Sequence, residues 1–202
     1  ANMRLSMPIP NQATVKPIID EIRGEIVSAI HDAWDDWMAS PYVGVWRCKR
    51  SRANFLWEQI IGKAHSALLA LPSIHVIEGI GTMTFLVQDQ VLFRFKKADD
   101  AGRTANVATQ AAIDFHDHDK DLLGLPEIQR VEVVYKLNKL ETAIQDICVV
   151  ARVGANVAWE YSLVDAGDVI APLPMPEPEP VRPAAKVVML KGARDDRKKH
   201  EM

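Results

Sequence analysis

The chain has 202 residues, of which 48% are hydrophobic and 25% are charged, so it is long enough for one domain with a substantial core. Its net charge is −3 and its pI is about 6.1, which excludes a protein that is basic over its whole surface. A local basic patch is still compatible with this balance.

Two amphipathic helices are predicted in the first third of the chain. Residues 1–13 are polar and contain prolines, so we expect a flexible N-terminus, after which Thr14 is a suitable N-cap. Apolar residues then recur at three- and four-residue spacing from Ile18 to Trp37, and this helix should end before the Ser-Pro pair that follows. A second apolar stripe predicts a helix over residues 53–71.

Strands are predicted in the middle of the chain. Apolar and polar residues alternate within residues 74–97, with a turn at Gln88–Gln90. A short helix that ends near Phe115 should follow, and then three more strands over residues 130–140, 142–153 and 157–164. Because hairpins dominate this order, the sequence predicts an α+β fold: an antiparallel sheet of about five to six strands, with helices packed on one face.

The composition changes after residue 168. Residues 171–180 carry proline at every second position, which predicts an extended spacer of the polyproline II type. We therefore expect a single α+β domain over residues 14–168 and a Pro-rich linker with a basic tail over residues 169–202. An apolar segment in this tail is a candidate partner-binding peptide, formed by Val187, Val188, Met189 and Leu190. The alternative is a disordered, solubilising end.

A basic cluster ends the strand that precedes the short helix. Arg94 and Lys96 lie on one face of this strand, with Lys97 next to them, so they can present converging donors to a phosphate or carboxylate. The order of elements up to this point resembles the restriction-endonuclease-like nucleases, which need a carboxylate two residues before the lysine to hold Mg²⁺. Arg94 occupies that position and cannot ligate a metal, so the resemblance leaves open only a degenerate, binding-only core. The alternative is a basic sheet edge that discourages pairing with other chains.

A second basic cluster lies between the first two helices. Four cations occur within six positions beside Trp46: Arg47, Lys49, Arg50 and Arg52. They are candidates for binding a phosphate backbone while the indole stacks on a base. The alternative is a solvated loop with Trp46 in the core.

The histidines and cysteines give no predicted catalytic or metal site, and no cofactor is expected. His116 and His118 are two residues apart near a helix end and do not share a helix face, which favours a solvated helix end over a metal site. Cys48 lies among cations that can lower its pKa, but it has no evident histidine or aspartate partner. Cys48 and Cys148 form no CxxC pair, so we expect a reducing, cytoplasmic setting. The sequence shows no signal peptide and no apolar run of about 18 residues, so no membrane segment is expected.

Two blocks of the sequence resemble a known group of proteins. The first is Val91–Lys97 with Gly102, Asn106, Thr109–Gln110 and Phe115, and the second is Tyr135–Asn138 with Thr142, Ile144–Gln145 and Trp159. Together they are similar to a little-characterised bacterial family encoded on mobile or defence loci, beside metallopeptidase-like (ImmA/IrrE-type) or helix-turn-helix genes. The resemblance covers residues 18–165. It implies a toxin–antitoxin or phage-defence setting, with this chain as the non-catalytic member.

The function expected from the sequence is therefore the binding of a partner rather than catalysis. The first expectation is a non-enzymatic protein that binds a toxin or defence component in the manner of an antitoxin. The alternative is a nucleic-acid-binding protein with a degenerate nuclease-like core, which would use the two basic clusters.

Overall fold

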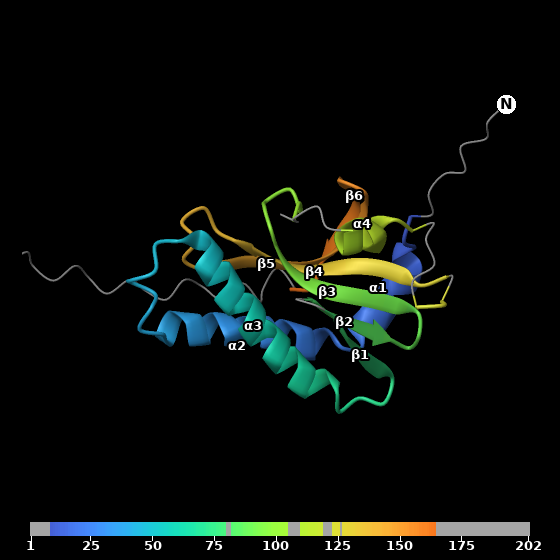
Figure 1. Cartoon of the computed structure of the whole chain (residues 1–202), viewed down its shortest axis with the longest axis horizontal. Helices are drawn as coiled ribbons and strands as arrows, with labels where there is room; N and C mark the ends of the chain where they lie inside the picture. The colour runs from blue at the N-terminus through green and yellow to red at the C-terminus, as the bar shows by residue number, and fades with distance from the viewer. Residues whose placement is uncertain (1–8, 80–81, 105–109, 119–122, 126, 165–202) are drawn as a thin grey trace, which may run out of the picture. The chain divides into compact units, whose positions relative to one another are not determined.

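The computed structural model of the chain describes residues 9–79, 82–104, 110–118, 123–125 and 127–164 (Figure 1). All of them belong to the first of the two units into which the chain divides, Ala1–Ile170. The predicted linker and tail, with the candidate peptide Val187–Leu190, lie outside the described residues.

Three helices form one layer of the fold: α1 (Gln12–Asp20), α2 (Arg23–Ala39) and α3 (Lys49–Leu68). The first begins two residues before the expected cap, because the side chain of Asn11 accepts a hydrogen bond from the backbone N–H of Ala13 (2.9 Å). The single helix predicted up to Trp37 is interrupted, since the chain turns at Glu21–Ile22. The apolar spacing hides this break because the buried residues continue through Ile22 into α2.

The second layer is a six-stranded sheet in the order β1-β2-β3-β4-β5-β6. Its strands are β1 (Ile74–Gly79), β2 (Thr82–Val87), β3 (Val91–Ala98), β4 (Gln129–Leu137), β5 (Ile144–Val153) and β6 (Asn156–Ser162). The α+β class is confirmed and the sheet is mostly antiparallel, as expected, with one parallel pair formed by β3 and β4. A parallel pair needs a crossover connection, and the segment containing α4 (Gln110–His116) makes it.

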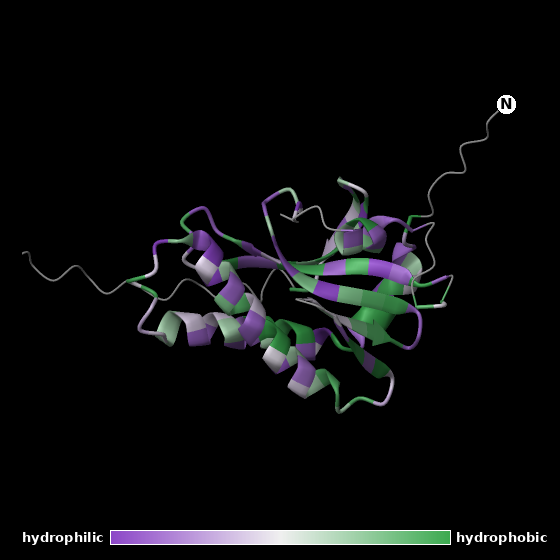
Figure 2. Ribbon diagram, viewed as in Figure 1, coloured by the Kyte–Doolittle hydropathy of each residue, from purple (hydrophilic) through white to green (hydrophobic). Residues whose placement is uncertain are grey.

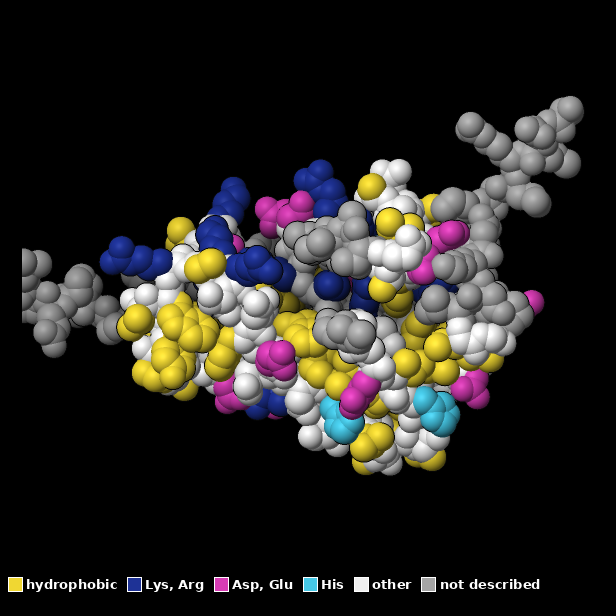
Figure 3. All heavy atoms as spheres, in the orientation of Figure 1, with side chains coloured by type: hydrophobic (Ala, Val, Ile, Leu, Met, Phe, Trp, Pro, Cys, Tyr) yellow, Lys and Arg dark blue, Asp and Glu magenta, His cyan; other side chains and the backbone are white. Residues whose placement is uncertain are grey.

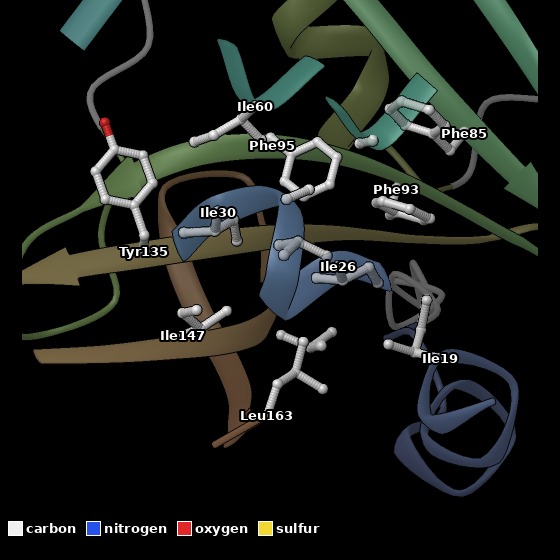
Figure 4. Packing of buried hydrophobic residues seen from close by; sticks show 14 of the residues in the cluster. Ile19, Ile26, Ile30, Ile60, Phe85, Phe93, Phe95, Tyr135, Ile147 and Leu163 are labelled. Atoms are coloured by element: carbon white, nitrogen blue, oxygen red, sulfur yellow. The ribbon is translucent and has the colours of Figure 1, made fainter. Parts of the chain in front are cut away.

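The main core lies between the sheet and the layer of α1, α2 and α3. Phe85, Phe93 and Phe95 form its aromatic centre, with the first two rings stacked at 5.2 Å between centroids. Figure 4 shows Ile26 and Ile30 of α2 lying towards these rings. In Figure 2, hydrophobic residues recur along the helices and along the strands of the sheet. Complete burial of each phenyl ring contributes about 1.5–3 kcal/mol, so this cluster holds the helices on the sheet.

The opposite face of the sheet is covered in part by α4, whereas the three longer helices pack on one face, as expected. Phe115 of α4 packs with Leu86, Leu92 and Ile128 in a small apolar cluster separate from the main core. Charged side chains of β3, β4 and β5 occupy much of this face beside the cluster. None of the helices among the described residues is long and apolar enough to cross a membrane.

Candidate functional site

The structure brings the two predicted basic clusters together at one carboxylate, Glu141. The Nζ atom of Lys49, at the start of α3, lies 3.2 Å from Glu141 Oε2, and Nζ of Lys97, at the end of β3, donates to Oε1 at 3.0 Å. The guanidinium of Arg52 also donates to Oε2. We call Lys49, Arg52 and Lys97 the cation cradle. Lys97 is far in sequence from Lys49 and Arg52, and the three residues converge because the first turn of α3 lies beside the end of β3.

Glu141 is held out towards the cradle by a tight turn between β4 and β5. Its backbone has a φ of 53°, in the left-handed region that non-glycine residues seldom adopt. The turn closes locally, since the side chain of Asn138 accepts a hydrogen bond from the N–H of Thr142 (2.8 Å). Partial burial alone would raise the pKa of Glu141, but hydrogen bonds from Arg52, Lys97 and Lys49 outweigh it and lower the pKa to about 2. The carboxylate is therefore ionised throughout the physiological range.

A cleft of about 1570 Å³ runs along β3 next to the cradle. It exists because β2 pairs with β3 only from Val91 to Phe93, so beyond that point the β1–β2 hairpin separates from β3. The walls come from α3, the β1–β2 hairpin, α4 and the β4–β5 turn. Cationic lining residues are Lys49, Arg50, Arg94, Lys96, Lys97, Arg103 and Lys139, and the acidic ones are Glu58, Asp99, Asp100, Asp114 and Glu141. Figure 3 shows Lys and Arg side chains gathered over the start of α3 and the neighbouring strands.

Lys96 is the most informative residue of this cleft. Its side chain is half-buried and makes no hydrogen bond or ion pair with any residue that the structure describes. Burial lowers the pKa of Lys96, and the positive charge of Arg94 lowers it further, only partly offset by Glu132. A lysine kept partly out of water without a counter-ion costs stability. An anionic ligand in the cleft would supply the missing charge.

Arg94 occupies a different environment from the one predicted for it. It is buried under α4, where its Nε and Nη2 atoms donate to Glu132 Oε1 at 3.0 and 2.7 Å. Its guanidinium lies 4.0 Å from the ring centroid of Phe115, a cation–π contact. Arg94 therefore forms part of the floor of the cleft, with its hydrogen-bonding capacity largely engaged by the protein.

Glu132 is the centre of a buried polar network on this face of the sheet. Besides Arg94, it accepts a hydrogen bond from the hydroxyl of Thr104 (2.9 Å) and lies 3.6 Å from Nη1 of Arg152 and 3.4 Å from Nε2 of His116. Burial would raise the pKa of Glu132, yet the hydrogen bond with His116 and the charge of Arg94 overcome this and lower it to about 2. The network thus holds one carboxylate permanently ionised among cations.

The two histidines are not at a solvated helix end, which corrects that expectation. His116 and His118 are both buried, and Nε2 of His118 lies 2.7 Å from the backbone oxygen of Arg152. Burial lowers the pKa of His118, which favours its neutral form. No group of three or more His, Cys, Asp and Glu side chains that could hold a metal ion occurs within the described parts of the chain.

The end of the α2–α3 pair forms a separate, apolar surface. The alternative that placed Trp46 in the core is wrong, since its side chain is 38% exposed and stacks on Tyr42 at 4.7 Å between ring centroids. Lys49, Arg50 and Arg52 belong to the first turns of α3 rather than to a loop, and Arg47 precedes them. We call the exposed apolar residues of this region the tip: Met38, Tyr42, Val43, Val45 and Trp46. Figure 3 shows hydrophobic side chains clustered at this end of the molecule.

The sequence did not predict the two carboxylates, Glu132 and Glu141, to which the cationic side chains bind. The sequence contained one signal for Glu132, because Arg130, Glu132 and Lys136 interrupt an otherwise apolar strand. Charges at alternate positions of a strand buried on both faces indicate partners across the sheet. Glu141 gave no such signal, because it belongs to a short polar turn.

Comparisons with known proteins add no family to these observations. No protein-family model matches the chain. No curated protein and no solved structure matches it either.

Proposed function

We propose that the protein binds single-stranded nucleic acid, with the phosphate backbone in the cleft along β3. The observation that carries this proposal is Lys96, a half-buried lysine without a counter-ion among the described residues, which lines the cleft. Proteins that bind single strands combine a positively charged groove with aromatic side chains on which bases stack. The aromatic part is supplied by Trp57, which is only partly buried and lines the same cleft as Lys96.

The cationic surface continues from the cleft towards the tip. Lys49 and Arg50 line the cleft where α3 begins, and Arg47 continues the positive charge to the stacked pair of Trp46 and Tyr42. Phosphates would follow the cations from Lys96 to Arg47, and a base would stack on the exposed indole. The overall charge of −3 does not oppose such binding, because screening limits charge effects to about 8–10 Å at physiological salt.

Binding rather than cleavage is the activity that these residues favour. The nuclease type considered above needs a carboxylate at the position of Arg94. The nearest carboxylate across the sheet, Glu132, is engaged by Arg94 and Thr104. We therefore expect no metal-dependent strand cleavage at Lys96.

Fluorescence anisotropy with a labelled oligothymidine tests the proposal. Affinity should fall steeply with salt, and Lys96→Met should weaken binding and reduce the slope of log K against log salt by about 0.7, the value for one phosphate contact on a single strand. Lys16→Met is the matched control, because Lys16 lies on α1, pairs with Asp20 (2.8 Å) and is outside the cleft lining. Absence of binding at low salt, or equal effects of the two substitutions, would refute the proposal.

A second candidate function, binding of a protein partner, is favoured by the tip. Val45 is 68% exposed and Met38 is 46% exposed, and neighbouring exposed apolar residues mark interaction surfaces. This is where a toxin or defence component would bind if the chain is the antitoxin-like member implied by the resemblance. Co-purification of a tagged chain from its native host, with Val45→Asp as the disrupting variant, tests it. Recovery of the wild-type chain alone and monomeric would count against this function.

A further inference from the structure

The cation cradle carries more positive charge than its single carboxylate can neutralise. Lys49, Arg52 and Lys97 bring three cations to Glu141, which leaves an excess of two charges at this point of the cleft wall. The donors approach both oxygens, since Oε1 receives Lys97 and Oε2 receives Lys49 and Arg52. A phosphodiester of a nucleic-acid backbone has two non-bridging oxygens and one negative charge, as a carboxylate does, so the same donors can bind it.

Glu141 is attached to the cradle by its side chain rather than by its backbone. Its N–H bonds to the oxygen of Asn138 within the same turn (2.8 Å), and the residues on either side, Leu140 and Thr142, are exposed. The carboxylate can therefore leave the cradle by rotation about its own side-chain bonds, without unpairing β4 from β5. Lys49, Lys97 and Glu141 all line the cleft, so a ligand there reaches them directly.

We propose that Lys49, Arg52 and Lys97 form a phosphate subsite of the cleft, which the carboxylate of Glu141 fills as an internal competitor. This inference rests on the proposed function, because the phosphate would belong to the bound nucleic acid. A phosphate that enters the subsite displaces Glu141, which then points into solvent. The affinity of the wild-type chain is reduced by the free energy of breaking the three contacts of Glu141.

The consequence is that removal of the Glu141 charge strengthens binding. Glu141→Gln should raise the affinity for labelled oligothymidine by about 3- to 10-fold at 0.1 M salt, because the incoming phosphate no longer has to displace a charged side chain. Glu58→Gln is the matched control, since Glu58 is an exposed acid of α3 that lines the same cleft and has no cation partner among the described residues. The Glu58→Gln variant shows how much the affinity changes when any one negative charge is removed from the cleft.

A double variant separates the subsite from a purely structural role of Glu141. If the cradle binds phosphate, Lys97→Met should remove most of the affinity gained by Glu141→Gln. If Glu141 only anchors the β4–β5 turn, Glu141→Gln should lower the melting temperature and leave the affinity unchanged or weaker. If Glu141→Gln does not fold, the affinity of Lys97→Met tests the subsite. A phosphate bound by Lys97 requires that Lys97→Met weakens binding more than Lys16→Met does.

The outcomes for this inference and for the proposed function are distinct. Equal affinities of Glu141→Gln and Glu58→Gln, with wild-type binding intact, would overturn the subsite and leave the proposed function standing. Failure of every chain, including Glu141→Gln, to bind the oligothymidine at low salt would overturn both.

Discussion

Replacing Glu132 by glutamine should destabilise the protein by about 3 kcal/mol at neutral pH. The substitution keeps the shape of the side chain and removes the charge that Arg94 and Arg152 face. The fold lowers the pKa of Glu132 from 4.5 to about 2, which at about 1.4 kcal/mol per pH unit corresponds to about 3 kcal/mol of stability. The cost of breaking a buried ion pair, about 3–5 kcal/mol, agrees with this value.

The stability difference between wild type and Glu132→Gln should depend on pH in a defined direction. A carboxylate whose pKa is lower in the folded chain stabilises it fully above the unfolded pKa, and this contribution is lost as the pH falls towards the folded pKa. The difference in stability between wild type and Glu132→Gln should therefore be about 3 kcal/mol at pH 7 and about 2 kcal/mol at pH 3.5. Urea unfolding monitored by tryptophan fluorescence at both pH values measures it.

Glu58→Gln serves as the control, because this exposed side chain has no ion pair with a described residue and should change stability by less than about 0.5 kcal/mol. A loss below about 1 kcal/mol for Glu132→Gln at pH 7 would contradict the reasoning. So would a difference from wild type that stays constant down to pH 3.5, since the carboxylate would then not be held by the network.

Three further predictions concern single side chains. Lys96→Met should leave the free energy of unfolding unchanged or raise it, because it removes a half-buried charge, and a loss above about 1 kcal/mol would show that the lysine has a structural role. Phe93→Ala should cost about 3–5 kcal/mol in urea unfolding, since the ring is completely buried against Phe85, and a loss under 2 kcal/mol would contradict the packing described. In thiol labelling at pH 8, Cys48 should react rapidly, because it is exposed and backbone hydrogen bonds lower its pKa. Cys148 should react only on unfolding, because burial raises its pKa to about 12, and two fast thiols would refute this.

Much of the fold could be predicted because helix and strand periodicities are local properties of the sequence. The alternation from Val91 to Lys97 and the apolar spacing of α2 and α3 follow directly from side chains that face one core. The parallel pairing of β3 and β4 did not follow from the sequence, because hairpins dominate the order of the strands. The predicted helix between these strands was the available clue, since it provides the crossover that a parallel pair requires.

The candidate site was predictable in its parts but not in its arrangement. Lys49, Arg52 and Lys97 were recognised as basic, but their meeting point depends on a contact between Arg52 and Glu141 across 89 residues, which no local pattern encodes. The sequence predicts Arg94 as a ligand-binding cation because it shares a strand face with Lys96. Its burial depends on α4 above it and on Glu132 in the next strand, both of which are tertiary features.

The ion pair between Arg94 and Glu132 also bears on how the chain folds. Strands β1–β3 and strands β4–β6 can each pair with neighbours that are close in sequence. The pairing of β3 with β4 joins residues 38 positions apart, so it requires the closure of a large loop. In the pairing of β3 with β4, Arg94 and Glu132 are directly opposite each other. A shift by one position would set each charge against an apolar residue of the helix-facing side, and a shift by two would set Arg94 against Arg130 or Val134. The pair therefore selects a single alignment when the two halves of the sheet meet.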